Sequence, residues 1–214
     1  MKNSAGKPIL LKMVAAIQEN KDYLGEVDGL IGDGDHGMNM NKGFSMFGDL
    51  IHEREIGFTD GLNELGNVLF SKIGGSMGPI YGTVFMGMAE AGKDFDEIDL
   101  DRFAAMLAAG LRDLRDVVQA QVGDKTLIDT LEPAVVAIEN AAAEGKSFAV
   151  ALDEMMAAAQ TGRDSTKDLV AKFGRSSRLG ERSKGVLDAG AVSCCIILCA
   201  MADGIRGGLT CAAS

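Results

Sequence analysis

Three aspartates, Asp28, Asp33 and Asp35, precede His36 within a short glycine-rich stretch of the chain. Three carboxylates this close together repel one another unless a cation holds them. Oxygen ligands on a tight turn suit Mg²⁺ or Ca²⁺ better than zinc, and Mg²⁺ completes its coordination with water and phosphate oxygens. The spacing is not that of an EF-hand loop, because the twelfth position counted from Asp28 is Asn39. The pattern therefore predicts a divalent-metal site, although aspartate and glycine are also common turn residues.

His36 adjoins this acidic cluster and has two interpretations. A neighbouring carboxylate raises the pKa of an imidazole and suits it to act as a base or a phosphate contact. A histidine at the start of a helix also serves simply as a hydrogen-bonding group, and the sequence leaves both interpretations open. The other histidine, His52, falls on the polar side of a predicted helix and is expected to be solvated.

Three further glycine-rich or polar segments lie between predicted helices, and two of them have features that suit an anion. KIGGSMGPIYG, residues 72–82, is a Gly-Gly-Ser turn that opens a helix, where free N–H groups attract anions. GDKTLID, residues 123–129, opens another helix, with Thr126 as a candidate cap. GRSSRLGERSKGVLDAG, residues 174–190, is basic within an acidic protein, and its arginines have a donor geometry that suits phosphate. Ordinary turns and a solvated loop explain each segment alone nearly as well.

The composition bounds the class of protein. The chain has 214 residues, 47% of them hydrophobic, and a formal net charge of −10. This length predicts one domain, residues 1–214, and the acidity argues against nucleic-acid binding, which needs a basic surface. No secretory signal precedes the first helix, and the most apolar stretch, Ala189–Met201, is too short to span a bilayer, so we expect a cytoplasmic protein without a membrane span. The cysteines match no zinc pattern and are expected to be free, mostly buried thiols: Cys194, Cys195, Cys199 and Cys211.

Apolar residues recur at helical spacing through most of the chain, and nowhere do β-branched and polar residues alternate over the length of a strand. The pattern predicts an all-α fold of eight amphipathic helices, the first of which ends at Gly25. The expected helices cover approximately residues 7–24, 38–54, 61–73, 79–92, 96–118, 123–145, 147–171 and 188–201, with Asp99 and Ser147 as N-caps.

The loops between these helices alternate in character. Those near Asp33, Gly75, Asp124 and residues 175–188 are glycine-rich or polar, and they follow the first, third, fifth and seventh helices. Short loops favour antiparallel neighbours, so alternate loops lie at the same end of a bundle. We therefore expect these four loops to converge on one rim.

Together, IGDGDHGMNMNKGF, KIGGSMGPIYG, GDKTLID and GRSSRLGERSKGVLDAGAVS resemble the signature segments of DhaL, the nucleotide-binding L subunit of dihydroxyacetone kinases. They occur in the family order, and the resemblance spans essentially the whole chain. It implies a barrel of eight antiparallel amphipathic helices with ADP or ATP at one end. The chain departs from the family pattern at Asp188–Gly190, which reads Asp-Ala-Gly rather than Asp-Pro-Gly, and at Met77, where a small residue is more usual.

The resemblance also implies roles for individual residues. Asp28, Asp33 and Asp35 match aspartates that hold two Mg²⁺ ions against the phosphates, and Arg175 matches an arginine on the nucleotide; these four residues would serve the phosphoryl transfer. The other nucleotide contacts that the resemblance implies are His36, Gly37, Met38, Asn39, Ser76, Met77, Thr126, Leu127, Asp188, Ala189 and Gly190.

The partners follow from the same resemblance. In this family a separate K subunit binds dihydroxyacetone covalently through a histidine. An L part that stands alone resembles the form of the bacterial phosphotransferase system, in which a phosphohistidine on an M subunit recharges bound ADP to ATP. The alternatives are a tetrulose kinase that exchanges ATP, a module that reports nucleotide state to a transcription regulator, and a metal-stabilised bundle without nucleotide. A fatty acid kinase is disfavoured, because such proteins typically have Asp-Gly-Asp-Thr-Gly where His36 follows Asp35 here.

Overall fold

Helices make up most of the structure, a computed structural model that describes the backbone of residues 1–212 and the side chains of residues 1–209. They are α1 (Lys7–Glu19), α2 (Lys21–Ile31), α3 (His36–Ile51), α4 (Phe58–Lys72), α5 (Met77–Gly92), α6 (Leu100–Val117), α7 (Ile128–Ala143), α8 (Phe148–Ser165) and α9 (Ala189–Ala212). Short 3₁₀ segments are η1 (Asn3–Ala5), η2 (Thr166–Asp168) and η3 (Ser176–Ser183). Residues 1–212 contain no β-strand, and one isolated bridge pairs Lys2 with Glu97. The all-α prediction is confirmed.

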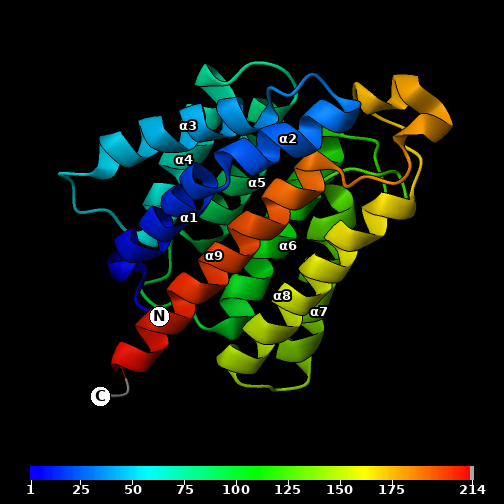
Figure 1. Cartoon of the computed structure of the whole chain (residues 1–214). Coiled ribbons are helices and arrows are strands. Elements are labelled where there is room, and N and C mark those ends of the chain that lie inside the picture. The colour runs from blue at the N-terminus through cyan, green and yellow to red at the C-terminus, as the bar shows by residue number, and fades with distance from the viewer. Residues whose placement is uncertain (213–214) are drawn as a thin grey trace.

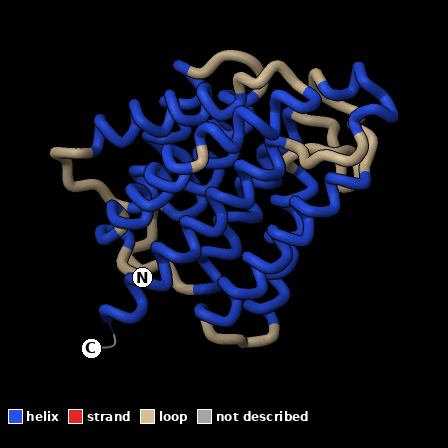
Figure 2. The backbone as a smooth tube through the Cα atoms, in the orientation of Figure 1, coloured by secondary structure: helices blue, strands red, loops and turns tan. Residues whose placement is uncertain are grey.

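The helices form the sides of a closed barrel (Figures 1 and 2). From α3 to α9, each helix packs against the next one along the chain. α1 packs against both α3 and α9 and so closes the ring. α2 follows α1 and lies against α3 and α9. The predicted eight-sided arrangement is therefore present, with α1 and α2 together forming one bent side.

The first predicted helix is wrong at its C-terminal end. The break comes at Asn20 rather than at Gly25, and α2 continues beyond both. The Asn20 side-chain amide donates to the carbonyl oxygen of Ala16 at 2.8 Å, a local bond that competes with a continuous helix. Gly25 lies inside α2, so Asp28 is on a helix and not in a loop.

The last helix, α9, is longer than predicted. Its segment Ala189–Leu209 has 21 residues and is long and apolar enough, by length and composition, to cross a membrane, but most of it is buried in the barrel. The predicted end of this helix at Met201 is therefore wrong, because the apolar segment continues to Leu209, and burial in the barrel accounts for its apolar character. Cys194 and Cys195 are buried, Cys199 is half-buried, and all three are free, as expected. The side chain of Cys211 lies outside the described residues.

The two predicted N-caps are confirmed. The Asp99 carboxylate accepts the N–H of Arg102 at 3.0 Å, and the Ser147 hydroxyl accepts the N–H of Val150 at 3.4 Å. Both caps stand at the starts of α6 and α8, at the end of the barrel opposite the predicted rim. They define the ends of two sides of the barrel without taking part in the site.

Apolar side chains from all sides fill the barrel. Phe85 of α5 stacks on Tyr81 with ring centroids 6.1 Å apart, and it meets Phe44 of α3 edge-on at 6.4 Å. All three rings are buried. This aromatic cluster extends toward the start of α9, because the Tyr81 hydroxyl donates to the carbonyl oxygen of Gly190 at 3.2 Å. The core is thus continuous with the rim.

α2 and α3 cross so closely that their backbones meet at Gly37. A Cβ on Gly37 would lie 2.0 Å from the carbonyl oxygen of Lys21 and 2.7 Å from the nitrogen of Gly25. Only a residue without a Cβ permits this approach. The crossing holds the start of α3, with Asp35, against the helix that carries Asp28.

We expect Gly37→Ala to lower the free energy of unfolding by about 1–3 kcal/mol, because the added methyl group must push two backbones apart. Urea denaturation measures this change. The matched control is Gly208→Ala on α9, where a Cβ would meet nothing within 4 Å and where alanine is the better helix former. Equal stability of the two variants would show that the crossing tolerates a wider separation.

Candidate functional site

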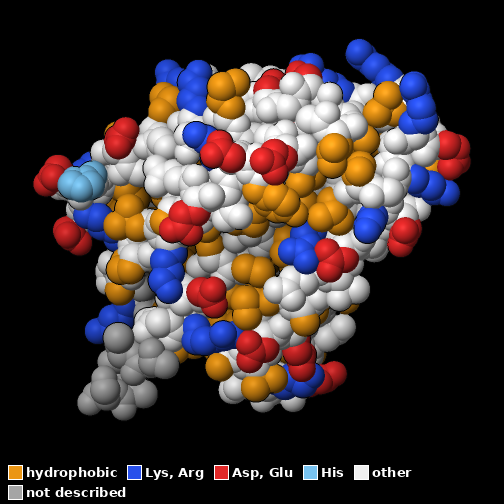
Figure 3. Space-filling model, in the orientation of Figure 1, with side chains coloured by type: hydrophobic (Ala, Val, Ile, Leu, Met, Phe, Trp, Pro, Cys, Tyr) orange, Lys and Arg blue, Asp and Glu red, His pale blue; other side chains and the backbone are white. Residues whose placement is uncertain are grey.

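Four segments meet at one end of the barrel. They are the loops 32–35, 73–76, 118–127 and 166–188, which precede α3, α5, α7 and α9. Arg175 forms an ion pair with Asp33, and Lys172 Nζ lies 2.6 Å from the Asp124 carboxylate. The Tyr81 hydroxyl on α5 lies 3.2 Å from the carbonyl oxygen of Gly190 in the first turn of α9. The predicted common rim is confirmed. Basic side chains stand out at the corner of the molecule formed by the loop between α8 and α9 (Figure 3).

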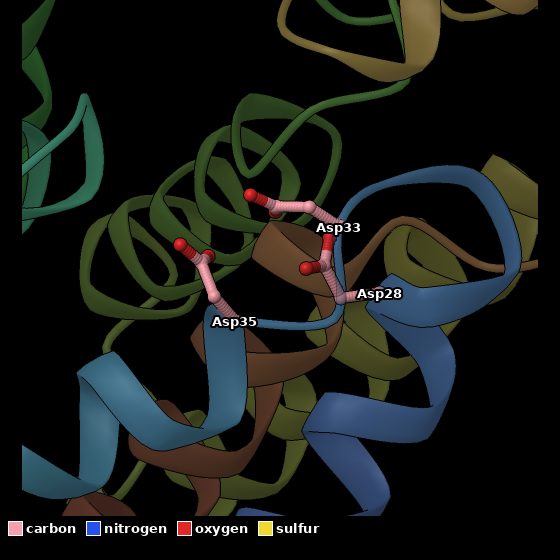
Figure 4. Close-up of side chains that lie close together, drawn as sticks. All are labelled: Asp28, Asp33 and Asp35. Carbon is pink, nitrogen blue, oxygen red and sulfur yellow. The ribbon is translucent and has the colours of Figure 1, made fainter.

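Asp28, Asp33 and Asp35 form a compact acidic cluster at this rim. They come from the last turn of α2, from the loop, and from the residue that precedes α3 (Figure 4). One carboxylate oxygen from each lies within 4.8 Å of the others. Gly34 has φ of 77°, a left-handed conformation that turns the chain between Asp33 and Asp35. A Cβ on Gly32 would lie 2.2 Å from Asp28 Oδ1, so this loop also needs glycine for space.

The negative charge of the cluster is only partly compensated. Burial, reinforced by the charge of Asp33, raises the pKa of Asp35, while Arg175 and a hydrogen bond from Asn39 oppose the shift. A raised carboxyl pKa means that ionised Asp35 is disfavoured in the folded chain. A divalent cation with a preference for hard oxygen ligands would relieve this repulsion, so the three residues fit Mg²⁺. No other group of three potential metal ligands is close enough to hold an ion in the part of the chain that the structure describes.

His36 is buried at the start of α3. Its Nε2 lies 2.8 Å from the hydroxyl oxygen of Ser193 on α9, and its backbone N–H donates to Asp28 Oδ2 at 3.3 Å. Burial lowers the pKa of His36 to about 4, although Asp28 opposes this shift. Of the two interpretations left open, the one that requires a raised pKa is not supported, because lost hydration outweighs the attraction of Asp28. Near pH 7 His36 is neutral, which supports the hydrogen-bonding interpretation.

Ser193 and Tyr81 complete a buried network that the motifs do not single out. The Ser193 and Tyr81 hydroxyls lie 2.6 Å apart, a distance at which one donates to the other, and the carbonyl oxygen of Gly190 is within hydrogen-bonding distance of both, at 3.1 Å from Ser193 and 3.2 Å from Tyr81. The network joins α3, α5 and α9 directly behind the acidic cluster. A signal is present in the sequence, since Ser193 is a polar residue inside the apolar stretch that forms α9.

The predicted residues Asp188, Ala189, Gly190 and Leu127 lie side by side. Asp188 caps α9, and its Oδ2 accepts the N–H of Ala191 at 2.8 Å. Burial raises the pKa of Asp188 to about 6, and this hydrogen bond works against the shift. A Cβ on Gly190 would lie 3.5 Å from Leu127, and both Leu127 and Ala189 are buried. The start of α9 is therefore packed on the start of α7.

Thr126 is not the main cap of α7. Its hydroxyl accepts the N–H of Ile128 at 3.2 Å. The buried carboxylate of Asp129 instead organises the turn, because it accepts the N–H of Gly123 at 2.6 Å and that of Thr126 at 2.7 Å. Asp129 is the last residue of the GDKTLID segment, and its spacing from Thr126 is that of a capping carboxylate.

The remaining predicted contacts have varied surroundings. Met38 is 64% exposed, Ser76 is exposed before the first turn of α5, and Met77 is half-buried against the core. Within residues 1–209, no hydrogen bond or ion pair joins these three side chains to the acidic cluster. Asn39 does reach it, through Asp35.

Comparison with known proteins decides the family. The family model described as the DAK2 domain matches residues 30–203. The chain belongs to the DAK2 domain family. The match includes the start of α3, the loop before α9 and most of the barrel between them, and Asp28 lies just ahead of it.

Individual DAK2 relatives extend the comparison. The chain is 39% identical over 186 residues to "PEP-dependent dihydroxyacetone kinase 1, ADP-binding subunit DhaL" of Listeria innocua, covering 86% of this chain and 88% of the relative. It is 33% identical to "L-erythrulose kinase" of Pectobacterium atrosepticum over 84% of this chain but only 31% of that protein. The crystal structure of the C. freundii dihydroxyacetone kinase with AMP-PNP and Mg²⁺ superposes with a TM-score of 0.70 at 21% identity, over 95% of this chain and 34% of that one, and so shares the fold.

We expect Asp35→Asn to have two opposed effects on stability. Without divalent ions the variant melts at a higher temperature than the wild type, because the substitution removes a carboxylate whose ionisation is disfavoured in the folded chain. With Mg²⁺ present the variant loses the stabilisation that ligand binding gives the wild type. Thermal melts with EDTA and with Mg²⁺ measure both effects.

The control for this experiment is Asp49→Asn, an exposed carboxylate on α3 away from the cluster. This variant should respond to Mg²⁺ as the wild type does. A normal Mg²⁺ response in Asp35→Asn would remove Asp35 from the metal ligands.

Proposed function

We propose that this DAK2 protein is the ADP-binding subunit of a dihydroxyacetone kinase. In this proposal the rim holds ADP or ATP together with two Mg²⁺ ions. The phosphoryl group comes from a phosphohistidine on an M-type donor subunit and passes to dihydroxyacetone bound on a K-type subunit. The protein is then a phosphotransferase subunit of the cytoplasm. The same subunit could also bind a transcription regulator and report its nucleotide state.

The observation that carries the proposal is the acidic cluster, whose three carboxylates lie within 4.8 Å of one another at the rim of a DAK2 barrel. Without a cation, repulsion between the three carboxylates destabilises such a cluster. A divalent cation that also binds phosphate oxygens would relieve this repulsion. The name of the Listeria relative, an ADP-binding subunit, supports nucleotide as the phosphate ligand. The C. freundii kinase of the same fold was crystallised in complex with AMP-PNP and Mg²⁺, which supports the same pairing.

The residues of the rim are arranged for positioning rather than for covalent chemistry. Phosphoryl transfer depends mainly on alignment and on spreading negative charge, and bound Mg²⁺ supplies that neutralisation. Asp28, Asp33 and Asp35 would hold the ions. Arg175 approaches from the opposite loop with 64% of its side chain exposed, so its forked donors are available to phosphate oxygens. Neutral His36 holds the start of α3 in place through Ser193.

A kinase of a four-carbon ketose is the second candidate. The Pectobacterium relative, named L-erythrulose kinase, favours it. In either case the ketose lies on another part of the enzyme, so the residues of this rim serve both candidates equally. Assays that supply dihydroxyacetone and erythrulose in parallel to the reconstituted enzyme separate them.

The first experiment is to identify nucleotide in the purified protein. The protein is denatured with acid without added nucleotide, and the extract is separated by ion-exchange chromatography against ADP and ATP standards. We expect about one equivalent of ADP per chain, since a coenzyme held with nanomolar affinity survives purification. An extract without nucleotide, with Mg²⁺ present throughout, would favour a kinase that exchanges ATP. Failure to bind either nucleotide by calorimetry would contradict the proposal.

We expect Arg175→Ala to slow phosphoryl transfer by roughly 100-fold, since loss of one preorganised donor to a developing anion has this effect. Its melting temperature should change little, because a largely exposed ion pair contributes little to stability. Transfer is measured in the reconstituted enzyme. Arg178→Ala, an exposed arginine of the same loop, is the matched control and should transfer normally. Equal rates for the two variants would take Arg175 out of the mechanism.

A further inference from the structure

Lys125 is a buried lysine between the segments of the rim. Its side chain belongs to the turn before α7 and is only 1% exposed. Lysine is rarely buried to this extent unless its charge is compensated. Lys125 also has φ of 61°, and it is the single non-glycine residue with positive φ in the described chain. A buried charge and an unfavourable backbone conformation coincide at one residue, and such costs concentrate at functional sites.

The Lys125 ammonium group joins three segments. Nζ donates to the carbonyl oxygen of Thr166 in η2 and, at 2.5 Å, to that of Val186 in the loop before α9. Because Lys125 itself belongs to the turn before α7, one cation links this turn, the end of α8 and the approach to α9. A neutral side chain of the same length offers these carbonyl oxygens no donor.

The neighbours of Lys125 continue the connection to Asp188. The Thr166 hydroxyl, which is buried, accepts the N–H of Asp188 at 3.0 Å. The backbone N–H of Gly185 donates to the carbonyl oxygen of Lys167 at 2.8 Å. Burial lowers the pKa of Lys125, and the charge of Asp188 is the first of the effects that oppose it. Lys125 is therefore linked both by hydrogen bonds and by charge to the turn that begins α9.

We propose that Lys125 is a positioning residue for the nucleotide site, whose ammonium group fixes the Asp188–Gly190 turn against the Thr126–Leu127 segment. This inference rests on the proposed function, since both segments are expected nucleotide contacts. Lys125 does not touch the acidic cluster by any described hydrogen bond or ion pair. Its removal is therefore expected to affect the nucleotide side of the site and to leave the metal side intact.

The test compares nucleotide and metal affinity in the full-length protein. ADP affinity with Mg²⁺ is measured by titration calorimetry on nucleotide-free protein, and Mn²⁺ affinity without nucleotide is measured by electron paramagnetic resonance. We expect Lys125→Met to weaken ADP binding roughly 10- to 100-fold, the range typical of supporting residues around a site. Its Mn²⁺ affinity should stay equal to that of the wild type. ADP affinity equal to the wild type would overturn the proposal, as would an equal loss of ADP and Mn²⁺ affinity.

Two further variants complete the design. Lys172→Met removes an exposed lysine of the same rim, which pairs with Asp124, and it should bind ADP normally. Lys125→Arg keeps the charge with a different donor geometry and should bind ADP with an affinity between those of Lys125→Met and the wild type. If Lys125→Met does not fold, Lys125→Arg decides, and wild-type affinity in it would overturn the proposal. Wild-type protein that binds Mn²⁺ but no ADP would instead count against the proposed function.

Discussion

Mutual repulsion among Asp28, Asp33 and Asp35 is the constraint on which the rest of the rim depends. The three carboxylates are held within 4.8 Å of one another, by a left-handed turn at Gly34 and by a helix crossing that leaves no room for a Cβ at Gly37. Burial raises the pKa of Asp35, and the charges of Asp33 and Asp28 add to this shift, so the folded chain bears both costs. The apolar interior of the barrel must supply the compensating stability, as is common where activity requires a strained or charged site.

The parts of the structure that could be predicted are those that depend on local sequence. Apolar periodicity identified the sides of the barrel, and alternation of polar loops identified the rim, because both follow from residues close together in the chain. The acidic cluster was equally accessible, since its three carboxylates lie on adjacent segments of the chain. Gly25 was misinterpreted because a glycine that ends a helix and one that admits a neighbouring helix look alike in sequence.

The features that escaped prediction depend on distant contacts. The pKa of His36 is set by burial against Ser193, which lies 157 residues away in the sequence. Nothing local distinguishes Arg175, which meets Asp33, from the other arginines of its loop; the family resemblance alone pointed to it. Lys125 lies within the GDKTLID motif, but its structural role depends on the carbonyl oxygens of Thr166 and Val186, which belong to other segments of the chain.

The closure of the ring at α1 and α9 has a consequence for how the barrel opens. Most neighbouring helices are also neighbours along the chain, and such local contacts form readily during folding. The seam between α1 and α9 is different: Lys12 reaches the carbonyl oxygen of Asp203 across 191 residues of sequence. Bringing such distant segments together carries the largest loop-closure entropy, so the seam is the natural place for the ring to come apart. The site spans it, with Asp28 on the α1–α2 side and Asp188 at the start of α9. A ligand bound by residues on both sides of the seam would stabilise the contact between α1 and α9, and with it the closed form of the barrel.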